Sequence, residues 1–452
     1  MLNYGFNYIV INFISWFICL ISAIFIFLKS PLKKYQKVLF LFSAPMIYLY
    51  PVISRCYCLI PLAISLIAYF YKDRKEKPIR YILSIVLLAN THIIMYGMVG
   101  VLLLAFLIEC FKERKNNDNK QNKKYIISFI LAIVLILISM YPIFSSLIVN
   151  KTTSIYATDN ILETISVAIM ILTLYVLALM PTFTKNMNNE LQRISSTIII
   201  MLFVYMLTSN IVITLITIPM IYLCLKLYPK YSLQFLLIIF WQLTIYIFIY
   251  DLSIQRLNTI ILIIMFFKWI NCYEKENIQD EKIILQNSFL EKIFIIFMII
   301  TLFFYGIIGI CQEIMLDYSY GKEIAEYIDA NIEEGSIFIT AGAPECITSI
   351  IPYLSGNYSF YHLTTNTYIS YATWDENIHS VINEDYGIDE IREIFGKQKI
   401  YYIACYGNFS IENDVYVIEN LTEENCLEEL YSTEINSIIG EDYCIYEIDL
   451  SK

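Results

Sequence analysis

The sequence predicts a polytopic α-helical membrane protein of about 12 spans, some of them re-entrant, followed by a C-terminal extracytoplasmic α/β domain. Of its 452 residues, 58% are hydrophobic and only 16% are charged, and the mean hydropathy is +0.61. Apolar runs separate the charged clusters, and several runs supply the ~20 residues that a helix needs to cross a bilayer. A soluble domain with so few charged residues could not cover its own surface.

Charge divides the chain near residue 311. Residues 312–452 contain 27 of the 41 acidic residues and 5 of the 31 basic ones, a net charge of −22, whereas 1–311 carries +12. Lys and Arg favour the cytoplasmic ends of spans, and an acidic segment of mixed polarity is typical of a solvated domain. We therefore predict a transmembrane domain over 1–311 and a soluble acidic α/β domain over 312–452. The acidity also argues against a nucleic-acid partner.

Six loops rich in Lys and Arg separate the apolar stretches of the first domain. If all six are cytoplasmic, the chain forms five hairpins, an entering span over about 7–28 and a final span over about 288–311. This topology places both termini outside the membrane. Residues 80–111 and 194–225 are short for a hairpin, so each is either a re-entrant pair of half-helices or a single span. The loops are 29–37, 72–80, 112–124, 185–193, 226–230 and 268–282.

The C-terminal domain alternates helix and strand patterns. Helical spacing over 320–332 is followed by Gly335 as a stop, and further helices are expected over 346–354 and 388–395. Short apolar runs predict strands, and their alternation with helices favours a largely parallel sheet. Thr340-Ala-Gly-Ala-Pro is not a Gly-rich phosphate loop, which argues against a nucleotide site. The predicted strands are 336–340, 360–363, 400–405, 415–418 and 443–448.

Few ionisable side chains fall at the predicted outer ends of spans, where they are costly and commonly functional. Arg55 lies between Pro51 and Pro61, which indicates a broken, cavity-lining backbone. An Arg there either grips a phosphate through two parallel hydrogen bonds or anchors the span at the interface. Asn90 and His92 interrupt an apolar run, where each either contacts a substrate or forms a hydrogen bond between helices.

Asp251 and Arg256 share a polar outer turn. Asp251 is either a base or the ion-pair partner of Arg256, and Asp159 is a second candidate acid in another outer loop. Three His residues without ligand spacing argue against a His-based metal site. Neither a GxSxG motif nor a Ser-His-Asp arrangement occurs. Asp251 and Asp159 are therefore the candidate catalytic residues, and no metal ligands are predicted.

Several of these segments resemble bacterial members of the GT-C superfamily, the polytopic glycosyltransferases that use polyprenyl-phosphate sugars. The resemblance rests on the loop Lys29-Ser-Pro-Leu-Lys-Lys, on Pro51-Val-Ile-Ser-Arg-Cys-Tyr57 and on Leu87-Leu-Ala-Asn-Thr-His92. Ser253-Ile-Gln-Arg256 is similar to a late turn of the family, although Leu257 stands where that Arg is often followed by His. Two runs look like the family's tail, Ile351-Pro-Tyr-Leu354 and Thr373-Trp-Asp375.

The resemblance implies an enzyme of the bacterial plasma membrane that transfers a sugar from a polyprenyl-phosphate donor at the outer face. Its partners would be membrane lipids and the lipid-linked sugar. The family places an acid after its first span, as a base or to position a divalent cation, but here no Asp or Glu precedes Asp73. We therefore expect a chain that lacks the first span and catalytic loop and is inactive alone, unless it uses Asp159 or Asp251. The substrate-binding residues so implied are Arg55, Tyr57, Asn90, His92 and Arg256.

Three other functions remain open from the sequence. One is an enzyme like the O-antigen polymerases and ligases, which also use an Arg at the outer face. The others are a transporter and a membrane anchor that presents a sensor domain. A transporter is expected to show inverted repeats and more polar residues at the middle of the membrane, and the sequence contains no internal repeat.

Overall fold

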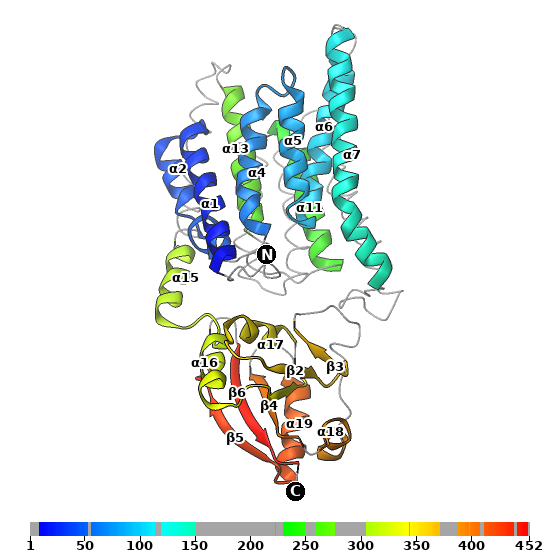
Figure 1. Ribbon diagram of the computed structural model, residues 1–452. Coiled ribbons are helices and arrows are strands. Elements are labelled where there is room, and N and C mark those ends of the chain that lie inside the picture. Colours follow the sequence, from blue (N-terminus) through cyan, green and yellow to red (C-terminus); the bar gives the residue numbers. More distant parts are fainter. Residues whose placement is uncertain are drawn as a thin grey trace. The chain divides into compact units, whose positions relative to one another are not determined.

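The chain folds into two compact units (Figure 1). One comprises residues 1–148 and 156–309, and the other comprises 149–155 and 310–452. The protein is seen in a computed structural model. The residues that this structure describes are 9–52, 56–113, 119–150, 222, 229–248, 256, 258–275, 304–342, 344–370, 387–396, 398–406, 411–437 and 441–450.

The first unit is built of packed helices with an aromatic interior. Phe266, Phe267 and Trp269 are fully buried, and Phe266 meets Tyr71 edge to face with ring centroids 6.1 Å apart. Such ring pairs add ~0.5–1.5 kcal/mol to the burial of their surface. Helix α4 packs against α1, α5 and α13, and α11 packs against α6. The described helices are α1 (Ile9–Lys29), α2 (Lys34–Leu41), α4 (Leu59–Tyr71), α5 (Pro78–Ala89), α6 (Tyr96–Glu113), α11 (Ser232–Phe248) and α13 (Thr259–Lys275), together with α7 (Asn119–Asn150) and α15 (Phe304–Met315), each of which includes residues of both units.

The prediction of a polytopic membrane protein with about 12 spans is wrong. Among the residues that the structure describes, two helical segments are long and apolar enough to cross a membrane, Val10–Lys29 and Ile93–Lys112. Each has 20 residues, with mean hydropathies of 2.5 and 2.4. One of them lies near the N-terminus, so the pair indicates at most a membrane anchor or a signal sequence.

The backbone explains why composition overestimates the number of spans. Residues 35–71 are predicted as a hairpin of two spans, but they form α2, a π-helix over Pro45–Leu49 (η2), the short α3 (Tyr50–Val52), a 3-10 turn over Cys56–Cys58 (η3) and α4. With 13 residues, α4 is ~20 Å long, which is short of the ~30 Å hydrocarbon core. The other apolar helices that are too short to cross a membrane cover 78–89, 232–242 and 259–273, with 10–17 residues each.

The second unit contains a six-stranded mixed sheet, which confirms an α/β fold for this part of the chain. The strand order is β3-β2-β1-β4-β6-β5. Strand β1 pairs in parallel with β2 and β4, whereas the β2–β3, β4–β6 and β5–β6 pairs are antiparallel. Parallel pairing is thus confined to β2, β1 and β4, and the prediction of a largely parallel sheet is wrong, since three of the five described strand pairs are antiparallel. The strands are β1 (Ile337–Thr340), β2 (Ser359–His362), β3 (Thr367–Ile369), β4 (Ile400–Tyr406), β5 (Leu427–Ser432) and β6 (Asp442–Ile448).

Helices cover both faces of this sheet. Phe338 and Ile339 are consecutive in β1, yet they belong to different cores, because side chains alternate across a strand. The Phe338 core includes α16 (Gly321–Asn331) and α17 (Pro344–Ile350), and the Ile339 core includes α18 (Ile388–Phe395) and α19 (Ile411–Glu423). The segment 415–418, predicted as a strand, lies inside α19.

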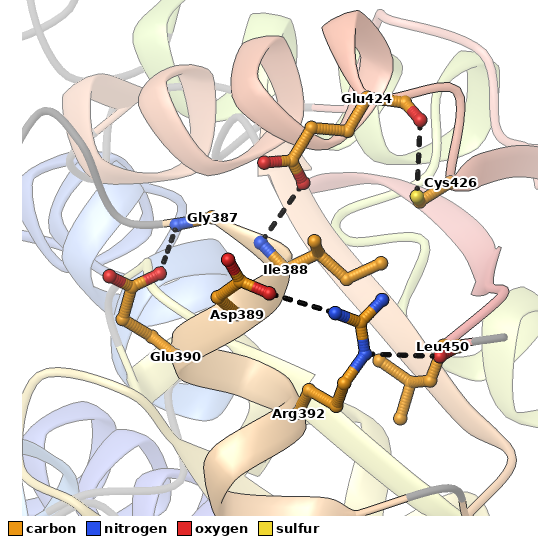
Figure 2. A network of polar contacts seen from close by, with 8 residues as sticks. All are labelled: Gly387, Ile388, Asp389, Glu390, Arg392, Glu424, Cys426 and Leu450. Atoms are coloured by element: carbon orange, nitrogen blue, oxygen red, sulfur yellow. Dashed lines mark hydrogen bonds and ion pairs between the residues drawn. The ribbon is translucent and has the colours of Figure 1, made fainter. Parts of the chain in front are cut away.

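The start of α18 is held by carboxylates (Figure 2). Glu424, which follows α19, accepts a hydrogen bond from the Ile388 amide at 3.1 Å, and Glu390 accepts one from the Gly387 amide at 3.0 Å. These amides point out of the first helical turn, where negative charge is favourable. At the other side of the helix, Arg392 donates to the Leu450 carbonyl at 3.2 Å. The network ties α18 to the residue after α19 and to Leu450, which follows the last strand, β6.

We expect Glu424→Gln to destabilise the second unit by about 1 kcal/mol, because a neutral amide is a weaker cap for the α18 amides. Chemical denaturation followed by hydrogen exchange of peptides from α18 measures the loss. Glu423→Gln is the matched control, since Glu423 is an exposed neighbour in α19. Equal protection of α18 in both variants would contradict the capping role.

Candidate functional site

Three of the predicted substrate-binding residues meet at one point of the first unit. The Tyr57 hydroxyl lies 3.1 Å from His92 Nε2, and Arg256 Nε donates a hydrogen bond to the same hydroxyl at 3.4 Å. Tyr57 is 35 positions from His92 and 199 from Arg256 in the sequence. The fold therefore brings together an aromatic hydroxyl, an imidazole and a guanidinium from three separate segments.

Tyr57 is held in place by ring stacking. It sits in η3, just before α4, and is 2% exposed. The Tyr50 ring lies parallel to it, with centroids 6.0 Å apart at an angle of 9°, and the His92 ring lies on it at 4.9 Å and 27°. Tyr50 follows the π-helix that begins at Pro45. Along a continuous helix, residues 50 and 57 would lie about two turns apart, whereas here their rings stack.

The hydrogen bonds of His92 define its tautomer. Its backbone is extended, and its side chain caps the 3-10 turn η4 (Ile93–Met95), where Nδ1 accepts a hydrogen bond from the Ile94 amide at 3.3 Å. A nitrogen that accepts carries no proton, so in the neutral ring Nε2 holds the hydrogen. Nε2 therefore donates to Tyr57. Because Arg256 also donates to Tyr57, the proton of the Tyr57 hydroxyl points away from both.

Arg256 is positioned through its backbone. Its carbonyl accepts a hydrogen bond from Thr259 Oγ1 at 2.7 Å, and Thr259 in turn accepts one from Gln242 Nε2 of α11 at 2.8 Å. Thr259 and Gln242 are both fully buried. This chain of hydrogen bonds fixes Arg256, which lies three residues before the start of α13. Arg256 and His92 are both half-buried residues.

The remaining predicted residues do not join the cluster. Asn90 ends α5, and its exposed side chain donates to the Val86 carbonyl of the same helix at 2.8 Å. Arg55, Asp159 and Asp251 lie outside the described residues. Within the described ranges, no group of three or more His, Cys, Asp and Glu side chains could hold a metal ion.

The cluster has the donors that an anion needs. A guanidinium presents five N–H groups in a plane, and its Nε bond to Tyr57 orients that plane. Charge-assisted bonds from Arg to phosphate or carboxylate are about twice as strong as neutral ones. The imidazole and the phenol add further polar groups beside it. The arrangement is chemically suited to one phosphate group.

Four residues that support the cluster were not predicted from the sequence. They are polar or aromatic residues: Trp241 bonds to Ile93 across 148 positions, whereas the contacts of the other three with the cluster or its support span at most 17. A polar pair, Trp241-Gln242, in the middle of an apolar helix is the one signal that could have indicated them, because buried polar groups require partners. The four residues are Tyr50, Trp241, Gln242 and Thr259.

The comparisons with known proteins add no relative to this picture. No family model matches the chain, and no curated protein matches it. The site must therefore be interpreted from its own geometry.

Proposed function

We propose that this chain binds the phosphate of a polyprenyl-phosphate-linked sugar and takes part in the transfer of that sugar. The cluster of Arg256, Tyr57 and His92 is the single observation that carries the proposal. It supplies a half-buried guanidinium, held by a Tyr hydroxyl that also receives the imidazole N–H. Two-pronged donation from Arg suits a phosphate better than the point charge of Lys does.

The lipid part of the proposed ligand fits the apolar helices. One of the two membrane-length segments, Ile93–Lys112, begins directly after His92. A ligand with an isoprenoid tail and a phosphate head would reach the cluster where an apolar helix starts. We propose attachment to a bacterial plasma membrane through these helices, with the C-terminal domain on the extracytoplasmic side.

The chemical step of the transfer would need an acid or base within hydrogen-bond reach of the reacting group. The sequence offers Asp159 and Asp251 for this work, and both lie outside the described residues. The proposal therefore separates into two parts. Binding of the lipid phosphate rests on the cluster, and transfer of the sugar rests on the sequence resemblance.

We expect Arg256→Gln to weaken the binding of a polyprenyl phosphate by at least tenfold, since a hydrogen bond to a charged group contributes ~1.5–3 kcal/mol. Titration of the purified full-length chain in detergent, with the lipid followed by calorimetry, measures this change. Arg80→Gln is the matched control, because Arg80 is an exposed Arg of the same unit.

The ligand series separates the possible sources of affinity. Polyprenyl phosphate should bind, the corresponding polyprenyl alcohol should not, and inorganic phosphate should compete at high concentration. Equal binding of the alcohol and the phosphate would remove the role of the cluster. Unchanged affinity in a folded Arg256→Gln protein would do the same.

A further inference from the structure

We propose that Trp241 and Gln242, consecutive residues of α11, are the positioning residues that hold His92 and Arg256 at Tyr57. The consequence for ligand binding rests on the proposed function. The positioning itself rests on contacts between described residues and can be tested without a ligand.

Trp241 controls the segment that carries His92. Its indole Nε1 donates to the Ile93 carbonyl at 3.1 Å, and Ile93 follows His92 directly. The same carbonyl accepts the amide that closes the 3-10 turn η4. The indole also lies against Gly97 of α6, where an added Cβ would be 2.3 Å from Trp241 Cβ and Cγ. The turn that presents His92 is thus held between α6 and α11.

Gln242 controls the segment that carries Arg256. Its amide nitrogen donates to Thr259 Oγ1, whose hydroxyl donates to the Arg256 carbonyl. The carbonyl oxygen of the Gln242 side chain is buried and has no hydrogen-bond partner among the described residues. A buried acceptor left unpaired is costly, and Leu at this position would avoid that cost. The bond to Thr259 accounts for a Gln here.

The two contacts come from one rigid element. Neighbouring side chains on a helix point ~100° apart, so residues 241 and 242 can reach different neighbours, α6 on one side and α13 on the other. A single helix therefore sets both the place of His92 and the place of Arg256. His92 and Arg256 both donate to the Tyr57 hydroxyl. The distance between these two side chains therefore decides whether one phosphate can contact both.

Two substitutions separate the contacts. Trp241→Phe keeps the Cβ and ring carbons that meet Gly97 but removes the N–H to Ile93. Gln242→Leu keeps the volume but removes the N–H to Thr259. Thr259→Val is a second way to break the same bond if Gln242→Leu does not fold. Thermal unfolding of each variant shows that the first unit remains folded.

Chemical modification of the full-length chain, mapped by mass spectrometry, tests the positioning without a ligand. Trp241→Phe should raise the reactivity of His92 toward diethyl pyrocarbonate roughly fivefold, the equivalent of one neutral hydrogen bond, and leave the reactivity of Arg256 toward phenylglyoxal unchanged. Gln242→Leu or Thr259→Val should do the reverse. His362 of the second unit is fully buried, and its reactivity toward diethyl pyrocarbonate should be the same in all variants, which makes it the internal reference. Equal effects at both residues, or at neither, would overturn the proposal.

Double-mutant cycles then connect positioning with binding. Trp241→Phe should weaken polyprenyl-phosphate binding in the wild-type background and have no further effect in a His92→Ala background, because coupled residues are not additive. Gln242→Leu should lose its effect in an Arg256→Gln background. The crossed pairs, Trp241→Phe with Arg256→Gln and Gln242→Leu with His92→Ala, should remain additive. Additive behaviour in all four pairs would overturn the inference, whereas a wild-type chain that binds no polyprenyl phosphate would overturn the proposed function and leave the modification experiment to decide the positioning.

Discussion

Gly97→Ala is expected to lower the thermal unfolding midpoint of the first unit by several degrees and to weaken the Tyr57 cluster. An added Cβ would lie 2.3 Å from Cβ and Cγ of Trp241 and 2.6 Å from its Cδ1. These atoms are next to the backbone, so they cannot move aside unless α11 itself shifts. Overpacking of this kind costs ~1–3 kcal/mol, and the shift would also strain the Trp241 bond to Ile93.

Gly100 of the same helix provides the control. It is exposed, and an added Cβ there would meet no atom within 4 Å. Gly100→Ala should therefore be neutral or stabilise the helix by up to ~1 kcal/mol, since Ala is the better helix former. Thermal scans of the two variants, followed by Trp fluorescence, give the comparison. The same midpoint for both would show that α6 and α11 are not in close contact.

The sequence points to the cluster but not to what supports it. His92 stands out because polar groups that interrupt apolar runs need partners. Arg256 stands out because it lies in a polar turn, and Tyr57 is indicated only by the resemblance. Their mutual contact depends on how α4, α5 and α13 pack, and one sequence does not show the register of helices that are far apart. Trp241 is 148 positions from the carbonyl that it binds. No local pattern could reveal that pair.

The strands were predictable where they are buried and missed where they are exposed. The runs that became β1 and β4 are apolar, and both strands are mostly buried, as central strands of a sheet covered on both faces must be. Strand β5 has the sequence Leu-Glu-Glu-Leu-Tyr-Ser and lies at the sheet edge, with three exposed and three half-buried residues. Its acidic residues removed the apolar pattern by which a strand is predicted. The three-residue β3 is the other edge strand.

Residues 415–418 show tertiary structure overriding local preference. Val415-Tyr-Val-Ile418 has the β-branched and aromatic composition of a strand, yet it lies in α19. The buried residues Asp414, Val417 and Leu421 recur at helical spacing and face the sheet. That period is visible in the sequence only if a polar residue, Asp414, is counted with the core. Its burial is the unexpected feature of this domain.

Asp414 joins the carboxyl ends of β1 and β4. Its carboxylate accepts hydrogen bonds from the Tyr402 hydroxyl at 2.6 Å and from the Cys405 amide at 3.4 Å. An added Cβ on Gly342, just after β1, would lie 2.4 Å from Oδ2, so a side chain does not fit there. His362 of β2 binds the carbonyl of the same glycine through Nε2 at 2.7 Å. Two buried titratable residues thus hold Gly342.

Burial dominates the titration of Asp414. Loss of water raises its pKa to about 6 from an ordinary 3.8, although the bonds from Tyr402 and Cys405 oppose the shift. A raised pKa means that the folded state keeps its proton where the unfolded state has lost it. The stabilising contribution is therefore complete below about pH 4 and is lost as pH rises to about 6. This direction is opposite to ordinary acid denaturation.

We expect the wild-type second unit to lose about 3 kcal/mol of stability relative to Asp414→Asn between pH 4 and pH 7, because one pKa unit corresponds to ~1.4 kcal/mol. Hydrogen exchange of peptides from β1 and β4 in the full-length chain, corrected for intrinsic exchange rates, measures the difference.

Asp329 is the matched contrast. Partial burial raises its pKa, but amide bonds from Ser355 and Gly356 outweigh this and lower it. The pH dependence of Asp329→Asn should therefore match that of the wild type over the same pH range, and the wild type should lose the stabilisation by the Asp329 carboxylate only in stronger acid. If the stability of the wild-type domain followed that of Asp414→Asn over this pH range, burial would not raise the pKa of Asp414.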